Sequence, residues 1–510
     1  MKKKSLETRK IDRFFKKMDG QGLALSYGDV RLRTGHSEIL PREVNIESRF
    51  SRNIGLKIPI VSSPMDTVTE AKMAIAMAIA GGIGVVHKAL TPKKQAAAIG
   101  KIKHYLNAFI SDPICVNVFD SVSEVLKMKA EKDYKFYSFP VINEDGQVVG
   151  LVTRNDFDFS SSPTDMMGQI MSKEIIKADA NTTMEGAYKM MMKTRKKILP
   201  IFNSNGGLKG IYTWADVKRI ISGGSDIYNL DKNGSLIAVA AIGVGEDLEE
   251  RMELLSREKV DAVVIDTAHG DSKAVIAAIK FCKKYHPEID VIAGNISEAD
   301  SARNLIKAGV DGLRVGQGPG SICTTRVIAG IGCPQVSAVY NCSKAARGSG
   351  VPICADGGIE FSGDIPIALA AGAQNVMLGK MLAGTTEAPG VVIYKNGRPL
   401  KSYRGMGSLG AMLDNKSSRE RYFQGEVTID KLVPEGIEGE VDYRGDVDVI
   451  INQLVGGLRS GLGYVGAKDI ADLQAKADFH KISGVGLKES HPHGLVSIKD
   501  APNYRAEKFS

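Results

Sequence analysis

The chain has 510 residues, of which 43% are hydrophobic and 25% are charged, the proportions of an ordinary globular protein. They exclude a chain without a hydrophobic core, and the length predicts more than one domain. Lys and Arg number 67 against 59 Asp and Glu, a net charge of +8. That small excess suits an anionic small ligand and gives no specific sign of nucleic-acid binding.

The six cysteines support neither a disulfide framework nor a structural zinc site, because they form no Cys-x-x-Cys pair. The first ten residues are basic, but no apolar segment of a secretion signal follows them. No apolar run of about 18 residues, the length that crosses a membrane, occurs anywhere in the chain. We therefore expect a cytoplasmic protein with no membrane partner.

Eight short, almost continuously apolar runs predict parallel strands that are buried on both faces. They lie at residues 58–63, 82–87, 236–243, 262–267, 290–295, 312–316, 351–356 and 375–379. Helical patterns separate most of them, and three end in a glycine just before the next strand (Gly81, Gly309 and Gly372). Eight strands with helical crossovers predict an α/β fold, a (β/α)8 barrel. Periodicity leaves an open doubly wound sheet as the alternative.

The strand–helix rhythm breaks between about residues 106 and 226, where the chain repeats itself. The segment 140–157 is similar to 200–217 at an offset of 60, with six identical residues in register. This predicts two small modules packed together as a separate domain, inserted after the second strand of the barrel. The repeat resembles a pair of CBS modules, which implies adenine or guanine nucleotide effectors at Thr153/Asp156 and Thr213/Asp216. The alternative is that each Thr-x-x-Asp only caps the following helix.

Polar residues and glycines gather at the carboxyl ends of the predicted strands, which meet at one mouth of a barrel. The richest stretch runs from Gly316 to Arg326 and contains Cys323. Its alternating glycines let backbone groups approach a ligand closely, and oriented amides together with Arg326 favour a nucleophilic thiolate. The alternative for a lone cysteine is an inert apolar residue, which we retain for the other five.

The last two strands end in Asp356-Gly357-Gly358 and Gly379-Lys380, where barrels often bind a phosphate. The Asp356 carboxylate suits a pair of ribose hydroxyls. A long, polar, glycine-rich segment follows, and about 385–440 is expected to form a mobile flap. Its Gly-x-Gly-x-x-Gly at 405–410 is not interpreted as a Rossmann fingerprint, since no apolar strand precedes it.

Over nearly its whole length the chain resembles the IMP dehydrogenase / GMP reductase family. The resemblance rests on SSPMDTVTE (62–70), GGIGVVHK (81–88), GPGSICTTR (318–326), ADGGI (355–359), YRGMGSLGAM (403–412), RYFQ (421–424), PEGIEG (434–439) and ESHPH (489–493). The Arg-Tyr pair with PEGIEG is typical of the dehydrogenases. The chain departs from the family at Lys380, where serine is usual.

The resemblance implies NAD-dependent oxidation of inosine monophosphate to xanthosine monophosphate, a step of guanine nucleotide biosynthesis. Cys323 would form a covalent thioimidate, and flap residues Arg421 and Tyr422, with Thr325, would then direct its hydrolysis. The implied substrate contacts are Ser63, Met65, Ser321, Asp356, Gly357, Gly358, Gly379, Lys380, Tyr403, Arg404, Gly405, Met406, Gly407 and Glu435. The implied cofactor contacts are Asp266, Asn295, Gly316, Gln317 and Gly318.

The resemblance further implies a potassium ion and a homotetramer or octamer. The ion's ligands would be Gly318, Gly320 and Cys323, with Glu489, Ser490 and His491 from a neighbouring subunit. The expected domains are a catalytic barrel with its flap (1–105 and 227–510) and a regulatory tandem CBS domain (106–226).

Three other functions remain open from sequence. One is a GMP reductase, which a shortened flap without Arg-Tyr would have favoured. Another is a non-catalytic nucleotide-sensing scaffold, whose binding would survive loss of Cys323. The last is a Cys–His hydrolase using His269, which would act without NAD.

Overall fold

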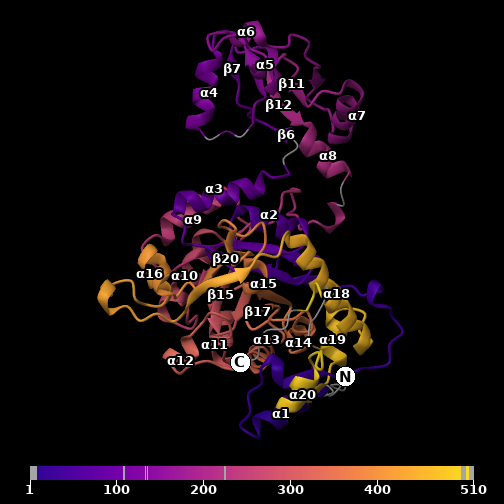
Figure 1. Cartoon of the computed structure of the whole chain (residues 1–510), viewed down its shortest axis with the longest axis vertical. Coiled ribbons are helices and arrows are strands. Elements are labelled where there is room, and N and C mark those ends of the chain that lie inside the picture. Colours follow the sequence, from indigo (N-terminus) through magenta and orange to yellow (C-terminus); the bar gives the residue numbers. More distant parts are fainter. Residues whose placement is uncertain are drawn as a thin grey trace. The chain divides into compact units, whose positions relative to one another are not determined.

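The computed structural model describes residues 9–106, 109–132, 134, 136–222, 225–495 and 501–504 (Figure 1). Most of the basic N-terminal segment therefore lies outside the described residues. The chain divides into two units, Met1–Tyr105 with Ile227–Ser510, and Leu106–Asp226. No helix in the described ranges is long and apolar enough to cross a membrane.

The larger unit is built on a closed barrel of eight parallel strands in the order β13-β14-β15-β16-β17-β18-β4-β5. Their bounds are β4 Ile60–Ser62, β5 Ile83–Val86, β13 Val239–Ile242, β14 Ala262–Asp266, β15 Asp290–Ile296, β16 Gly312–Val315, β17 Ile353–Asp356 and β18 Asn375–Leu378. Each strand coincides with one predicted apolar run, and β15 extends one residue beyond its run. The barrel is thereby confirmed, and the open sheet is excluded.

Helices follow the strands and cover the barrel. They are α2 Ala71–Ile79, α3 Pro92–Lys103, α9 Leu248–Arg257, α10 Lys273–Tyr285, α11 Ala299–Ala308, α13 Gln335–Ala346, α14 Asp364–Ala370 and α18 Val447–Val465. Gly81, Gly309 and Gly372 have φ angles of 88°, 103° and 118°. The predicted left-handed helix stops are therefore present, and each turns the chain into the next strand.

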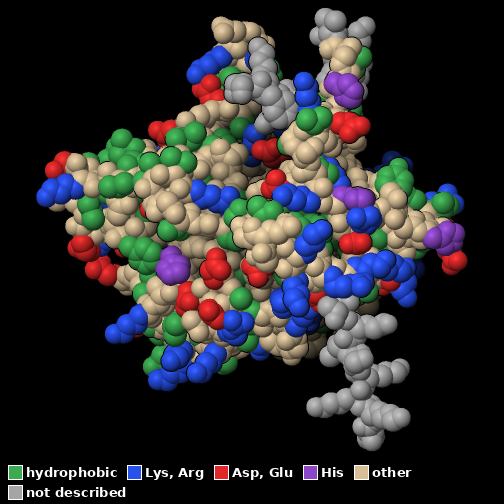
Figure 2. All heavy atoms as spheres, turned by 90° about the horizontal axis from the view of Figure 1, so that it is seen from below, with side chains coloured by type: hydrophobic (Ala, Val, Ile, Leu, Met, Phe, Trp, Pro, Cys, Tyr) green, Lys and Arg blue, Asp and Glu red, His purple; other side chains and the backbone are tan. Residues whose placement is uncertain are grey.

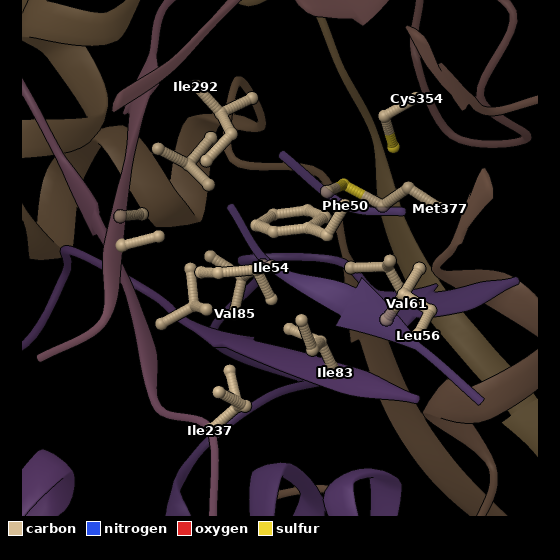
Figure 3. Packing of buried hydrophobic residues seen from close by; sticks show 14 residues of the cluster. Phe50, Ile54, Leu56, Val61, Ile83, Val85, Ile237, Ile292, Cys354 and Met377 are labelled. Carbon is tan, nitrogen blue, oxygen red and sulfur yellow. The ribbon is translucent and has the colours of Figure 1, made fainter. Parts of the chain in front are cut away.

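The amino ends of the barrel strands are plugged by a hairpin of β2 Ser48–Arg49 and β3 Gly55–Leu56. Phe50 at its tip is 1% exposed and packs among barrel residues such as Val85, Ile292 and Met377 (Figure 3). The neighbouring Asn53 amide donates to Asp290, at the start of β15. Because this end is filled by side chains, a ligand can enter only at the carboxyl ends of the strands.

The smaller unit contains two similar halves. One has a sheet of β7 Val116–Asn117, β8 Phe139–Ile142 and β9 Val148–Val152, with α4 Val122–Glu131, α5 Arg154–Asp158 and α6 Met167–Ile170. The other has a sheet of β10 Ala178–Asp179, β11 Ile198–Phe202, β12 Leu208–Thr213 and β6 Phe109–Ile110, with α7 Met184–Thr194 and α8 Trp214–Ser222. The repeat seen in the sequence is therefore a structural repeat.

The chain leaves the barrel for the smaller unit after α3 and returns before β13. The insertion point is therefore a helix-to-strand connection, which lies on the opposite side of a barrel from the strand-to-helix loops. The sequence placed it after the second strand, which is correct in order, but the helix α3 comes between.

The segment after β18 is more ordered than a plain loop. It contains an antiparallel sheet of β19 Ile393–Lys395, β20 Arg398–Arg404 and β21 Glu438–Asp442, with α15 Lys380–Ala383 before it and α16 Leu409–Asp414, α17 Lys416–Arg421 and η4 Ile429–Lys431 between β20 and β21. The strand that precedes the Gly-x-Gly-x-x-Gly is β20, with the polar sequence RPLKSYR, so no apolar strand precedes the motif, as expected. The antiparallel pairing of β20 also excludes a Rossmann unit, which needs parallel strands.

The remaining elements pack around the barrel. They are α1 Lys10–Asp19, η1 Tyr27–Asp29, β1 Val30–Leu32, η2 Pro41–Glu43, η3 Ser225–Ile227, α12 Thr325–Ile328, α19 Ile470–Lys476, β22 Phe479–Lys481 and α20 Gly484–Glu489. β1 pairs with β22 and so joins the N-terminal and C-terminal parts. On the face shown in Figure 2, basic and acidic side chains both occur among hydrophobic ones, so the net charge of +8 is spread.

Candidate active site

A cleft opens at the carboxyl ends of the barrel strands. It is lined by the loops after β4, β16, β17 and β18 and by the segment between β20 and β21. Of the sequence-predicted residues, the lining includes Ser63, Met65, Asn295, Gly316, Gln317, Gly318, Gly320, Ser321, Cys323, Thr325, Asp356, Gly357, Gly358, Gly379, Lys380, Tyr403, Gly405, Met406, Arg421, Tyr422 and Glu435. Residues from distant parts of the chain thus meet in one cavity.

Cys323 lies in this cleft, on the loop between β16 and α12. Its thiol is 3.2 Å from the Thr325 hydroxyl and 3.7 Å from the Glu435 carbonyl oxygen. Cys323 also forms an isolated β-bridge with Gly436. The segment 435–436 therefore holds the catalytic loop from the other side of the cleft. The three buried cysteines, Cys282, Cys342 and Cys354, have thiol pKa values raised by burial, as inert apolar residues do.

Arg326 shapes the Cys323 loop. Its guanidinium donates to the Gln317 carbonyl at 3.0 Å and also to the Cys333 carbonyl. Both hydrogen bonds tie the two ends of the loop together. The sequence predicted that Arg326 favours the thiolate of Cys323, and the structure places its charge in electrostatic interaction with that thiol besides these two hydrogen bonds.

A pocket for an anion lies beside the start of α15. The Tyr403 hydroxyl contacts the Ser321 side chain and the Lys380 backbone, and burial raises the pKa of Tyr403 to about 12, so it is a neutral donor. A Cβ at Gly379 would lie 2.9 Å from the Tyr403 oxygen, so this position needs glycine. The Ser63 hydroxyl is buried without a partner in the described chain. Such donors fit a phosphate.

Two carboxylates at the ends of β14 and β17 are joined by a buried arginine. Arg314 of β16 donates to Asp356 at 2.9 Å and to Asp266, and it is 3% exposed. The side-chain amide nitrogen of Asn295 also donates to Asp356, at 2.7 Å. The side-chain oxygen of Asn295 is buried without a partner among the described residues. Sequence reasoning missed Arg314. The sequence did contain a signal for it, since Arg314 stands in an otherwise apolar strand. A buried guanidinium must be paired, so an arginine at such a position indicates buried carboxylates nearby.

The flap helix α17 is docked over the cleft. Arg421 forms an ion pair with Asp266, and its carbonyl oxygen accepts from the Ala268 amide at 3.0 Å. Tyr422 is buried beside Gly407, where a Cβ would lie 2.5 Å from the tyrosine ring, and burial raises the pKa of its hydroxyl. The docked flap therefore places Arg421 and Tyr422 in the same cavity as Cys323.

Several predicted site residues lie outside the cleft. Arg404 is held by Asp66 and Asp414 on the outer side of β20, at 2.6 and 2.7 Å. Gly407 and Asp266 are covered by Tyr422 and Arg421. Glu489 and Ser490 end α20, and within the single chain His491 lines a second cavity with Pro319 and Arg326.

A cysteine, a docked flap helix and a group of hydroxyl and amide donors that meet at the mouth of a closed barrel are typical of a (β/α)8-barrel enzyme. Residues 24–493 match the model of the IMP dehydrogenase / GMP reductase domain. Inosine-5'-monophosphate dehydrogenases of Halalkalibacterium halodurans and Aquifex aeolicus are 44% and 46% identical, each over 94% of this chain, and the matches span 98% and 97% of those proteins.

Among solved structures, a cysteine-to-alanine variant of GMP reductase from Trypanosoma brucei in complex with guanosine 5'-monophosphate superposes with a TM-score of 0.84 and 39% identity. It covers 93% of this chain, and the match spans 98% of that chain. The chain belongs to the IMP dehydrogenase / GMP reductase family.

Proposed function

We propose that the protein is an NAD-dependent oxidoreductase that converts inosine monophosphate to xanthosine monophosphate in guanine nucleotide biosynthesis. The observation that carries this is the meeting in one cavity of Cys323, on the loop after β16, with the Arg421-Tyr422 pair at the end of α17. The family relatives above supply the substrate class.

In the first step, the Cys323 thiol loses its proton to solvent, the sulfur attacks C2 of the purine, and the hydride on that carbon leaves. Bound NAD⁺ supplies the acceptor for this hydride. Asp356 accepts from the ribose hydroxyls, while Ser321, Tyr403 and the amides around Gly379 bind the phosphate. The Asn295 side-chain oxygen, which has no partner among the described residues, and Gly316–Gly318 of the same cavity would hold the nicotinamide.

In the second step, water attacks the same carbon and the C2–S bond breaks, which releases xanthosine monophosphate and restores the thiol. The flap then occupies the place left by the reduced cofactor. Thr325 and Tyr422 position the water, and Arg421 accepts its proton within the buried cluster with Asp266. This burial is required because an arginine in water is always protonated.

We also propose a potassium ion at the Cys323 loop. Carbonyl oxygens of Gly318, Gly320 and Cys323 are hard ligands that suit an alkali cation. His491 lies near this loop, across Pro319 and Arg326. In a homotetramer or octamer, Glu489, Ser490 and His491 of a neighbouring subunit would complete the site.

The insert 106–226 is proposed to be a tandem CBS domain that binds adenine or guanine nucleotides. Its two similar halves support this. Thr153/Asp156 and Thr213/Asp216 are the proposed contacts.

The test of the reaction is absorbance of NADH with inosine monophosphate, NAD⁺ and K⁺, against oxidation of NADPH with guanosine monophosphate. We expect activity only in the first assay. The similarity to a GMP reductase structure makes the reductase the second candidate. Turnover in the second assay alone would establish it instead. Turnover in neither, with nucleotide binding retained, would favour the sensing scaffold.

A further inference from the structure

A buried ammonium group lies beneath the flap helix α17. Lys88 follows β5 and is 6% exposed, and a Cβ at Gly243 would lie 2.7 Å from its Nζ. Within the described chain, no acceptor is recorded within hydrogen-bond distance of this ammonium. A buried cation without a direct acceptor is costly, so this position is explained by something other than stability.

Four charged groups face Lys88 from the elements packed against it: Arg421 and Glu420 of α17, Asp247 before α9, and Arg251 of α9. Asp247 is already paired with Arg251, and Arg421 with Asp266. Burial, together with the like charge of Arg421, lowers the pKa of Lys88 to about 8. The adjacent His87, which like Lys88 follows β5, has its Nε2 atom 3.6 Å from a carboxylate oxygen of Glu70.

Docking of the flap creates this environment. Lys416 of α17 pairs with Glu246 at 3.2 Å, and a Cβ at Gly245 would lie 2.5 Å from a carboxylate oxygen of Glu420. α17 thus covers the loop after β13, against which Lys88 lies. When the flap lifts, Lys88 is left at the open mouth of the barrel.

We propose that Lys88 biases the barrel mouth toward the dinucleotide cofactor and against the closed flap. Uncovered, its ammonium pairs with the diphosphate of the cofactor. Covered, it is buried without an acceptor and beside Arg421. This rests on the proposed function, in which flap and cofactor use the same place in turn. Lys88 is a binding and positioning residue, and it takes no part in either bond-making step.

The proposal predicts that cofactor binding is linked to the uptake of protons by Lys88. Covered Lys88 has a pKa of about 8, and an uncovered lysine has its ordinary value of about 10.4. At pH 9, covered Lys88 is mostly neutral and uncovered Lys88 is charged, so cofactor binding takes up about 0.9 proton. The closed flap gains stability as the pH rises from about 8 to about 10.4, and gains no more above that range.

The experiment is calorimetric titration of NAD⁺ into Cys323→Ala with inosine monophosphate at pH 9, in two buffers of different ionisation enthalpy. The parent should take up close to one proton per NAD⁺. Adding Lys88→Met should abolish the uptake and raise the Kd about twentyfold, the bias that pKa values of about 8 and about 10.4 give at pH 9. The matched control is Lys93→Met, an exposed lysine on α3, which should leave both values unchanged.

Absence of proton uptake by the parent would overturn the proposal, even if Lys88→Met failed to fold. In the active chain, Lys88→Met should raise the KM for NAD⁺ about tenfold without slowing adduct hydrolysis. Slower hydrolysis at an unchanged KM would contradict the assignment. Failure of the proposed reaction can be told apart from failure of the Lys88 proposal. In the first case the active chain produces no NADH, although NAD⁺ binding can still be measured by calorimetry.

Discussion

The barrel mouth and the inserted unit use the same residue types for different purposes. In the insert, the Thr213 hydroxyl accepts from the Asp216 amide at 3.3 Å, and the Thr153 amide donates to Asp156 at 2.6 Å. Both pairs are helix caps. At the barrel mouth, Thr325 and Asp356 instead line a cleft. Convergence of strand ends is what turns such residues into the lining of a cleft at the barrel mouth, whereas in the insert the same pairs stand at helix starts and are proposed to meet nucleotides there.

The largest effect is expected from Cys323→Ala. Because the proposed reaction passes through a covalent bond to this sulfur, NADH production from inosine monophosphate should fall by about 10⁴-fold or more. Cys333→Ala, ten residues along the chain, is the matched control, since its thiol pKa is raised to about 11 by burial. Retention of substantial NADH production by Cys323→Ala would exclude the covalent mechanism.

Arg421→Ala should separate the two halves of the reaction. Hydride transfer does not need the flap, so a burst of NADH should remain, while hydrolysis slows about 10²- to 10³-fold and the adduct accumulates. Mass spectrometry of the quenched enzyme should find a nucleotide on Cys323. Arg419→Ala, on the same helix, is the control. A variant of Arg421 that gives no burst would contradict this division between thiol and flap.

How far the sequence predicted these features depends on whether each is local or assembled. Short local patterns of the sequence determine the eight strands and the three glycine helix stops, so these features could be predicted from the sequence. The Cys323 loop was recognisable for the same reason. Arg314 was missed because its partners Asp266 and Asp356 are 48 and 42 positions away, and only closure of the barrel brings them together.

The same limit applies to the contacts of two arginines. Arg326 is three positions from Cys323 in sequence, and its donors reach the Gln317 and Cys333 carbonyls. Arg404 follows the same logic, because its pairing with Asp66 crosses 338 positions of the chain. Neighbourhood in sequence suggests a role for a charged side chain, but the acceptors that fold around it determine which role it takes.

A smaller effect is expected in the insert from Thr213→Ala and from Thr153→Ala. Thr213→Ala removes the hydroxyl that accepts from the Asp216 amide, and Thr153→Ala removes the hydroxyl that donates to the Asp156 carboxylate at 2.8 Å. Each loss should lower the free energy of unfolding of the insert by about 1 kcal/mol and leave catalysis unchanged. Thermal unfolding followed by the fluorescence of Trp214 measures it. Thr164→Ala, an exposed residue of the same unit, is the control. Loss of nucleotide binding by the capping variants at unchanged stability would instead favour a direct ligand contact.

The smallest effect on catalysis should follow deletion of residues 106–226. The stems of the insert are fixed within the barrel unit itself: buried Lys103 pairs with Asp231 at 2.6 Å and with Asp261 at 2.8 Å, and the Asn229 amide donates to the Ala78 carbonyl. Since these contacts need nothing from the insert, the strands that carry the cleft should form without it.

A short glycine linker from Tyr105 to Ile227 should leave kcat within about threefold. A folded barrel with more than tenfold lower kcat would mean that the insert supports the cleft, whereas an unchanged kcat with loss of any nucleotide response would assign regulation to the insert alone.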